Sequence, residues 1–146
     1  MARTVVTFAS QVFNTSEPRP GYVNPGCYGD DVTRWLAAEM KKIGVPTEDP
    51  HQEDFGWYLP YRLGDQTFDF IVSYRPDESP SVWIGWIERE ASTLSSLLGG
   101  RNRNIPDEAA KAIHRILESN PGIREIRWHQ WKDFYKGREE LGTPAP

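Results

Sequence analysis

The chain has 146 residues, a length that suits one domain and leaves too few residues for two domains of ordinary size. Leu, Ile, Val and Phe contribute 31 residues, and six Trp and six Tyr add large rings, so the composition predicts a folded core and excludes a low-complexity chain. The net charge of −4 opposes contact with nucleic-acid phosphates over most of the chain, because only residues 101–146, with 9 basic and 7 acidic side chains, carry a positive balance.

Cysteine content and hydropathy indicate the compartment. Cys27 is the only cysteine, which excludes a disulfide within the chain and a zinc site of four thiolates. Residues 1–10 lack the apolar run of a signal peptide, and no stretch approaches the roughly 18 apolar residues that span a bilayer. We therefore expect a soluble cytoplasmic protein with no membrane partner.

The first third of the chain predicts a strand, a loop and a helix. Residues 4–8 are rich in β-branched side chains and predict a strand, and the prolines and glycines of residues 14–29 indicate a loop. Asp30 and Asp31 are suitable N-terminal caps for a helix over residues 31–43, whose apolar residues fall on one face. Glycine at position 44 then ends this helix.

The middle of the chain predicts three antiparallel strands. Apolar residues alternate over residues 55–63 and again over residues 68–74, with a Gly-Asp turn between them. Pro60 argues that the first of these strands lies at a sheet edge, where its Tyr58 and Tyr61 are available for pairing across a homodimer axis. Residues 82–87 are apolar on both faces, which is typical of a central strand or of a strand whose exposed face binds a partner.

The last third predicts a helix, a strand and a short helical turn. Residues 94–98 suggest one helical turn and residues 99–104 a mobile segment, before Pro106 opens an amphipathic helix. Residues 123–129 form the last expected strand, and Trp131, Phe134 and Tyr135 have the spacing of a helical turn packed on the body. We predict an α+β two-layer sandwich, with a mostly antiparallel sheet of about five strands and two main helices on one face, over a single domain of residues 1–138. Residues 139–146 are expected to form a fraying tail.

The loop before the first helix is a candidate for anion binding or for a reactive thiol. Small residues at a helix N-terminus favour an anion, but Asp30 and Asp31 place negative charge there, and the glycine spacing fits no nucleotide-binding motif. Cys27 lies in the same loop without a nearby histidine in sequence, so an inert thiol is the expected state. No cofactor is predicted.

Two segments of this sequence resemble segments of small uncharacterised bacterial proteins. They are the run of residues 22–31, YVNPGCYGDD, and the run of residues 53–57, EDFGW. The resemblance implies a bacterial source, and neither an activity nor a functional residue follows from it.

A small enzyme with a pocket between sheet and helices would draw on four acid–base candidates: His129, Glu39, Glu53 and Asp54. Glu39 falls within the apolar arc of the first helix, where it either escapes along its stem to the rim or joins a buried polar pocket. The acidic residues around His51 lack the spacing of a metal site, and a solvated acidic loop or a landing site for a basic partner fits them better. No set of nucleophile, base and orienting group is visible.

Nucleic-acid binding would have to use residues 124–138. Five basic side chains alternate there with four aromatic ones, as in single-strand binding proteins. However, Trp128 is in phase with Ile126 on one strand face, which is equally typical of core packing.

The sequence favours a non-enzymatic binding module that recognises a protein or a small ligand through aromatic residues on the sheet. Apolar residues on both faces of the strand at 82–87 leave one set facing solvent, a helix or a partner. The candidate contact residues are Trp57, Tyr58, Arg62, Trp83, Trp86 and Trp128.

Overall fold

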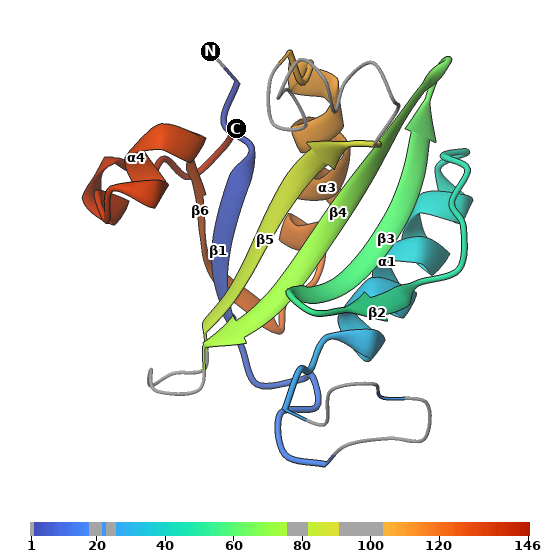
Figure 1. Cartoon of the computed structure of the whole chain (residues 1–146), viewed down its shortest axis with the longest axis horizontal. Helices are drawn as coiled ribbons and strands as arrows, with labels where there is room; N and C mark the ends of the chain where they lie inside the picture. The colour runs from blue at the N-terminus through green and yellow to red at the C-terminus, as the bar shows by residue number, and fades with distance from the viewer. Residues whose placement is uncertain (1, 18–21, 23–25, 76–81, 91–103) are drawn as a thin grey trace.

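The computed structural model describes residues 2–17, 22, 26–75, 82–90 and 104–146. It contains one antiparallel sheet of six strands in the order β2-β3-β4-β5-β1-β6 (Figure 1). The helical turn expected at 94–98 and the segment 99–103 lie outside the described residues. The elements are β1 (Val5–Ser10), α1 (Asp30–Lys42), β2 (His51–Glu53), β3 (Gly56–Leu63), β4 (Gln66–Arg75), β5 (Val82–Arg89), α3 (Asp107–Glu118), β6 (Ile123–His129), α4 (Trp131–Tyr135) and the 3-10 helix η1 (Glu139–Leu141).

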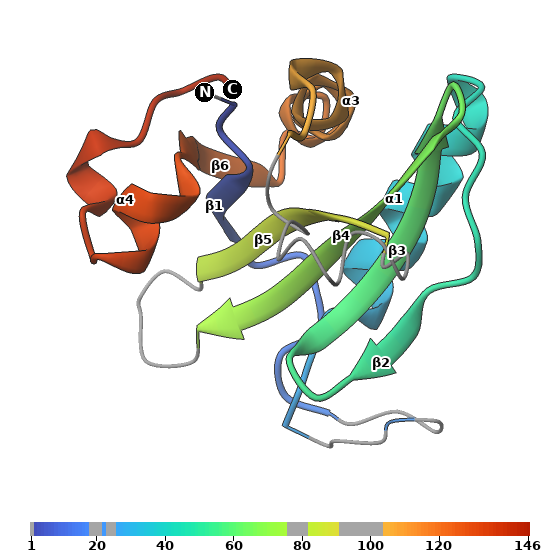
Figure 2. The same ribbon diagram turned by 45° about the horizontal axis from the view of Figure 1, so that its top comes forward.

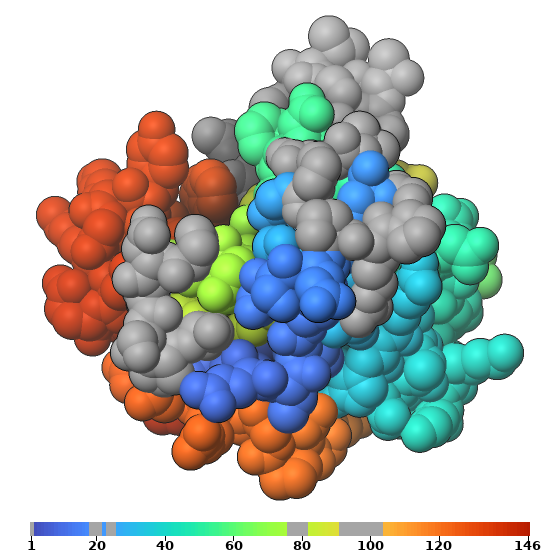
Figure 3. Space-filling view, turned by 90° about the horizontal axis from the view of Figure 1, so that it is seen from below, coloured from blue at the N-terminus to red at the C-terminus, as the bar shows by residue number. Residues whose placement is uncertain are grey.

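The two longer helices, α1 and α3, cover the same face of the sheet (Figures 1 and 2). The short helix α4 lies beside β1 and β6 at one end of the sheet, and the end-on view of Figure 3 places this red C-terminal segment on the opposite side of the molecule from α1, in cyan. We call the sheet face turned away from α1 and α3 the distal face. The predicted α+β architecture with two main helices on one face is confirmed.

Alternation along the strands determines which side chains enter the core. Trp57, Leu59 and Tyr61 of β3 point toward the helices and are buried, together with the in-phase residues of the neighbouring strands. Helix α1 buries Val32, Leu36 and Met40 against them, as its apolar face predicts. Within the described residues, none of the helices has the length and apolar character needed to cross a membrane.

The strand β2 was not predicted and corrects the position of β3. It pairs with β3 through His51↔Tyr58, and Thr47 forms a further bridge to Tyr61, so β3 is not the edge strand and is not free to pair across a dimer axis. The backbone of Pro60 faces the outer side of β3, where its carbonyl accepts a hydrogen bond from Glu48 N. Its nitrogen, which has no hydrogen to donate, lies on the same side, where the pairing of β3 with the outer segment is interrupted. Pro60 is therefore tolerated without an edge position.

Residues 139–146 fold back onto β6, contrary to the fraying tail that the sequence predicts. Thr143 pairs with Trp128 on the outer side of β6, with backbone N···O distances of 2.6 and 2.8 Å. Arg75 also forms an ion pair with Glu139 at 2.9 Å. The segment folds back because β6 otherwise presents unpaired backbone groups at the sheet edge.

Candidate functional site

An unbroken row of side chains crosses the distal face of the sheet. The strand registers place His51 opposite Tyr58, Tyr58 opposite Ile71, and Ile71 opposite Trp86. The row continues from Trp86 to Val5 and from Val5 to His129. Neighbours in such a row lie close enough for their side chains to contact one another, so the distal face carries an apolar and aromatic band.

A cleft of about 480 Å³ lies over the middle of this band. Its floor comes from β1, β3, β4 and β5, and its rims come from α4 and from the turn between β2 and β3. We call it the aromatic cleft; it is lined by Val5, Phe55, Tyr58, Ser73, Ile84, Trp86, Glu88, Trp131, Phe134 and Tyr135.

The two rims leave large apolar side chains in solvent. Phe55 on one rim is 72% exposed, and Tyr135 and Trp131 on the other are 79% and 38% exposed. Three such rings around a single cleft expose a large apolar area at one place, a feature that usually marks an interaction site.

Phe134 is the residue that fixes α4 to the sheet. Its ring packs against His129 at 5.3 Å between centroids, and the Arg75 guanidinium lies over it at 5.4 Å. Trp131 and Tyr135 pack on each other at 6.0 Å and remain at the surface. The helix thus holds two aromatic side chains at the cleft rim on a fixed support.

The aromatic cleft is negatively charged at one end. Glu88 is the one acidic residue in its described lining, and its carboxylate accepts a hydrogen bond of 3.2 Å from the Trp86 indole. Asp69 lies directly opposite Glu88 on β4. The pKa of Asp69 is raised to about 6, first by burial and then by the nearby carboxylates of Glu90, Glu88 and Glu53, against a lowering by His51.

Replacing Asp69 by asparagine is expected to stabilise the protein at neutral pH. Its raised pKa means that the folded state holds a proton between the ordinary value of 3.8 and about 6, whereas the unfolded chain has released it. The free energy of unfolding therefore falls as the pH rises through this range. Asp69→Asn should raise it at pH 7.5 by about 1 kcal/mol, less than the full shift implies, because water partly screens the carboxylate.

Urea unfolding of both proteins at pH 4 and pH 7.5 measures this effect. The variant should lose less stability than the wild type between the two pH values. A variant that is less stable than wild type at pH 7.5 would show that the carboxylate makes a favourable contact in the folded state.

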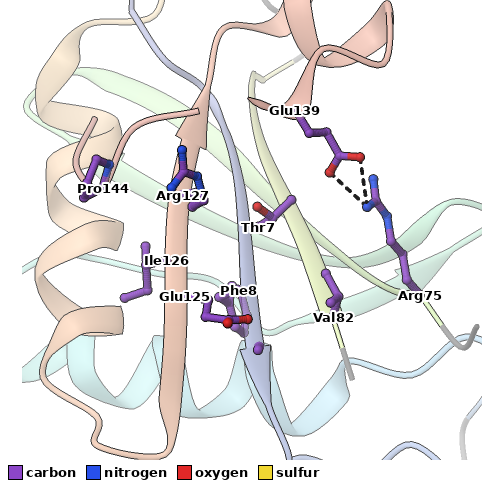
Figure 4. Close-up of a pocket in the computed structure, with 10 residues that line it drawn as sticks. Thr7, Phe8, Arg75, Val82, Glu125, Ile126, Arg127, Glu139 and Pro144 are labelled. Atoms are coloured by element: carbon purple, nitrogen blue, oxygen red, sulfur yellow. Dashed lines mark hydrogen bonds and ion pairs between the residues drawn. The ribbon is translucent and has the colours of Figure 1, made fainter. Parts of the chain in front are cut away.

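A second hollow lies between β1, β6 and the C-terminal segment (Figure 4). It is lined by Thr7, Phe8, Ala9, Arg75, Val82, Glu125, Ile126, Arg127, Glu139 and Pro144. Both of its arginines already bind groups of the protein: Arg75 pairs with Glu139, and Arg127 donates to the carbonyl of Gly142. These contacts hold the C-terminal segment in place. Because both arginines already bind groups of the protein, the hollow is a weaker candidate for ligand binding than the aromatic cleft.

The predicted contact residues separate into two groups. Trp57, Trp83 and Trp128 lie on the helix-covered side and are only 5%, 0% and 0% exposed. The expectation that these three contribute to a binding surface is therefore wrong. The physical reason is that each is in phase with the apolar residues that α1 and α3 cover.

Tyr58 and Trp86 do face the aromatic cleft, and Arg62 is exposed on β3 outside its lining. Phe55, Trp131 and Tyr135 are rim residues that the sequence does not identify as such. Trp131 and Tyr135 lie four residues apart on a short helix, and this spacing is equally typical of packing on the body.

The acid–base candidates are not brought together. His129 is 2% exposed, and its Nε2 lies 2.9 Å from Thr7 Oγ1 beneath α4. Burial lowers its pKa, and its Nδ1 has no hydrogen-bond partner among the described residues. Glu39 pairs with Lys42 at 2.9 Å on the outside of α1, while Glu53 and Asp54 are exposed at the β2–β3 turn.

Two further candidates also lack the required geometry. Trp128 lies in the core and donates its indole N–H to His114, so of the two tryptophans within residues 124–138 only Trp131 is accessible for nucleic-acid stacking. Burial raises the pKa of the Cys27 thiol, which opposes a nucleophilic role. The described part of the chain contains no group of three or more His, Cys, Asp or Glu side chains placed to hold a metal ion.

The aromatic cleft is thus the strongest candidate site that the described residues form. Comparison of the chain with protein-family models, with curated proteins and with solved structures finds no match.

Proposed function

We propose that the protein is a non-enzymatic binding module that recognises its ligand through the aromatic cleft of the distal face. The observation that carries this proposal is the set of exposed rings at the two rims, Phe55 on one side and Trp131 with Tyr135 on the other. Burying these rings against a partner removes apolar area from water at roughly 25 cal/mol per Å². Aromatic side chains of this kind are the usual hot spots of interfaces.

Several observations support binding rather than catalysis. The described cleft lining holds one carboxyl group, Glu88, and no histidine or lysine, whereas acid–base catalysis commonly uses two groups with different pKa values facing one substrate. The buried His129 faces Thr7 and the underside of α4, not the cleft. The lining is instead dominated by apolar and aromatic side chains with few polar groups, which is typical of recognition sites.

Removing a cleft ring is expected to abolish binding without unfolding the protein. Trp86→Ala and Tyr135→Ala should each reduce the amount of bound ligand at least tenfold, because truncating an aromatic hot spot costs about 2 kcal/mol or more of binding free energy. The measurement is native mass spectrometry of each variant, expressed in the organism from which the protein comes and purified without a denaturing step. The matched control is Ile43→Ala, which removes an exposed apolar side chain at the end of α1, away from the cleft.

The wild type and Ile43→Ala should carry the same additional mass, and the two cleft variants should lose it. Circular dichroism confirms that the variants are folded. An additional mass that all four proteins retain equally would place the binding surface elsewhere and overturn the proposal.

A further inference from the structure

The chemistry of the aromatic cleft indicates the charge of its ligand. Six of its lining residues are aromatic: Phe55, Tyr58, Trp86, Trp131, Phe134 and Tyr135. Aromatic rings carry negative charge on their faces and attract ammonium and guanidinium groups that lie within about 6 Å of the ring centre. The same protein shows this contact internally, because the Arg75 guanidinium lies 5.4 Å from the centre of the Phe134 ring.

The charged side chain of the cleft lining favours a cation as well, whereas the Arg75 guanidinium lies outside the lining, against the Phe134 ring. Glu88 supplies a carboxylate at the floor, and no basic residue belongs to the described lining. Asp69 lies opposite Glu88 in the sheet, and Glu90 and Glu53 are close enough to act on its carboxyl group. A positively charged group entering from this end would meet several carboxylates before it reaches the rings.

The shape of the site favours a polypeptide segment over a free small cation. The cleft extends across four strands of the sheet, from the β2–β3 turn to α4. Its most exposed rings, Phe55 and Tyr135, stand on opposite rims, so one small ion cannot cover both. An extended segment can place apolar side chains on the rims and a basic side chain on the floor.

We propose that the aromatic cleft binds a cationic segment of a partner protein, with an arginine or lysine side chain against its rings and the Glu88 carboxylate. This inference rests on the proposed function and adds the charge and polymer class of the ligand. Arginine fits best, because its planar guanidinium stacks on rings and pairs with a carboxylate at the same time.

The test compares two peptides of nearly the same shape that differ in charge. The probes are acetyl-GLRGLRG-amide and the same peptide with citrulline in place of arginine, which keeps the planar shape, removes the charge and replaces one NH₂ group by a carbonyl oxygen. Each is titrated into isotopically labelled protein, and the indole N–H signals of Trp86 and Trp131 are followed by NMR. The signals of the buried Trp83 and Trp128 serve as internal controls.

The arginine peptide should shift the Trp86 and Trp131 signals, and the citrulline peptide should bind at least fivefold more weakly. Glu88→Gln should weaken binding of the arginine peptide by a similar factor. The control Glu108→Gln makes the same charge change on α3, on the other side of the sheet, and should leave binding unchanged.

Three outcomes would overturn this inference. Equal binding of the two peptides would show a docking site that does not select charge, and would leave the proposed function intact. Shifts by guanidinium chloride that match those of the peptide at equal concentration would assign the site to a free organic cation. Absence of shifts with both peptides would exclude cationic segments, and the bound mass in the native experiment would then decide the proposed function separately.

Discussion

Truncating Trp128 to alanine should cost about 4 kcal/mol of the free energy of unfolding. The side chain is fully buried in the core between β6 and the helices, and its indole N–H donates to His114 Nδ1 at 3.1 Å. The substitution leaves a large cavity and removes the donor to His114 Nδ1, and both effects lower stability. This loss is a large part of the total stability of a domain of this size.

Trp86→Ala provides the matched comparison for Trp128→Ala. Trp86 lies on the distal face and is only partly buried, so its removal should cost roughly 1 kcal/mol in stability and affect binding instead. Urea unfolding monitored by circular dichroism measures both variants, and Trp128→Phe provides a milder core variant if the alanine form does not fold. Similar costs for the two alanine variants would contradict the assignment of these tryptophans to opposite faces of the sheet.

Adding a side chain at Gly85 should destabilise the protein by about 3 kcal/mol. Gly85 lies in the centre of β5 on the helix-covered side, and a Cβ built there would lie 2.2 Å from Phe70 Cζ and 2.7 Å from Phe70 Cε1. The Phe70 ring is fully buried, so it has no space into which to move. Gly85→Ala is therefore expected to shift the urea midpoint strongly downward.

A compensating substitution tests whether the Phe70 ring is the cause. Phe70→Leu shortens the opposing side chain, so the double variant Gly85→Ala with Phe70→Leu should be more stable than the sum of the two single losses predicts, by about 1 kcal/mol or more. Strictly additive losses would show that the cost at Gly85 comes from the backbone of β5 and not from this contact.

Most of the fold follows from periodicity that is visible in the sequence. The alternation of Trp57, Leu59 and Tyr61 predicts both the strand β3 and the face that it buries. The helix expected over residues 31–43 corresponds to α1, and its ends lie within one residue of the expected ends, but its N-cap is Gly29 and neither Asp30 nor Asp31 caps it as predicted. These elements are predictable because burial on one side imposes a strong period on the apolar residues.

The remaining elements depend on tertiary contacts. The strand β2 has the polar sequence His51-Gln52-Glu53, which has no apolar period, and it forms because its residues pair with β3 in register. The C-terminal segment has turn-forming residues that suggest fraying, yet Thr143 satisfies the outer edge of β6. Neither contact has a local signal in the sequence.

The sequence predicts an aromatic surface on the sheet, but it identifies only some of the residues that form the candidate site. Alternation in β5 places Trp83 and Trp86 on opposite faces, and periodicity alone does not say which face the helices cover. The structure buries Trp83, and Gly85 in the same phase makes room for the ring of Phe70. The rim residues Phe55, Trp131 and Tyr135 come from a turn and a short helix, whose positions over the sheet are set by packing of the whole chain.

Site-specific photo-crosslinking in living cells examines the binding role of the aromatic cleft most directly. The photoreactive residue p-benzoylphenylalanine replaces Tyr135 at the cleft rim in one variant and Ile43 at the end of α1 in another, both at exposed positions. Irradiation should produce a discrete covalent adduct at position 135, with no adduct at position 43, and the Trp86→Ala substitution should abolish it. Adducts of equal yield at both positions, or an adduct at position 135 that persists with Trp86→Ala, would contradict a binding role for this cleft.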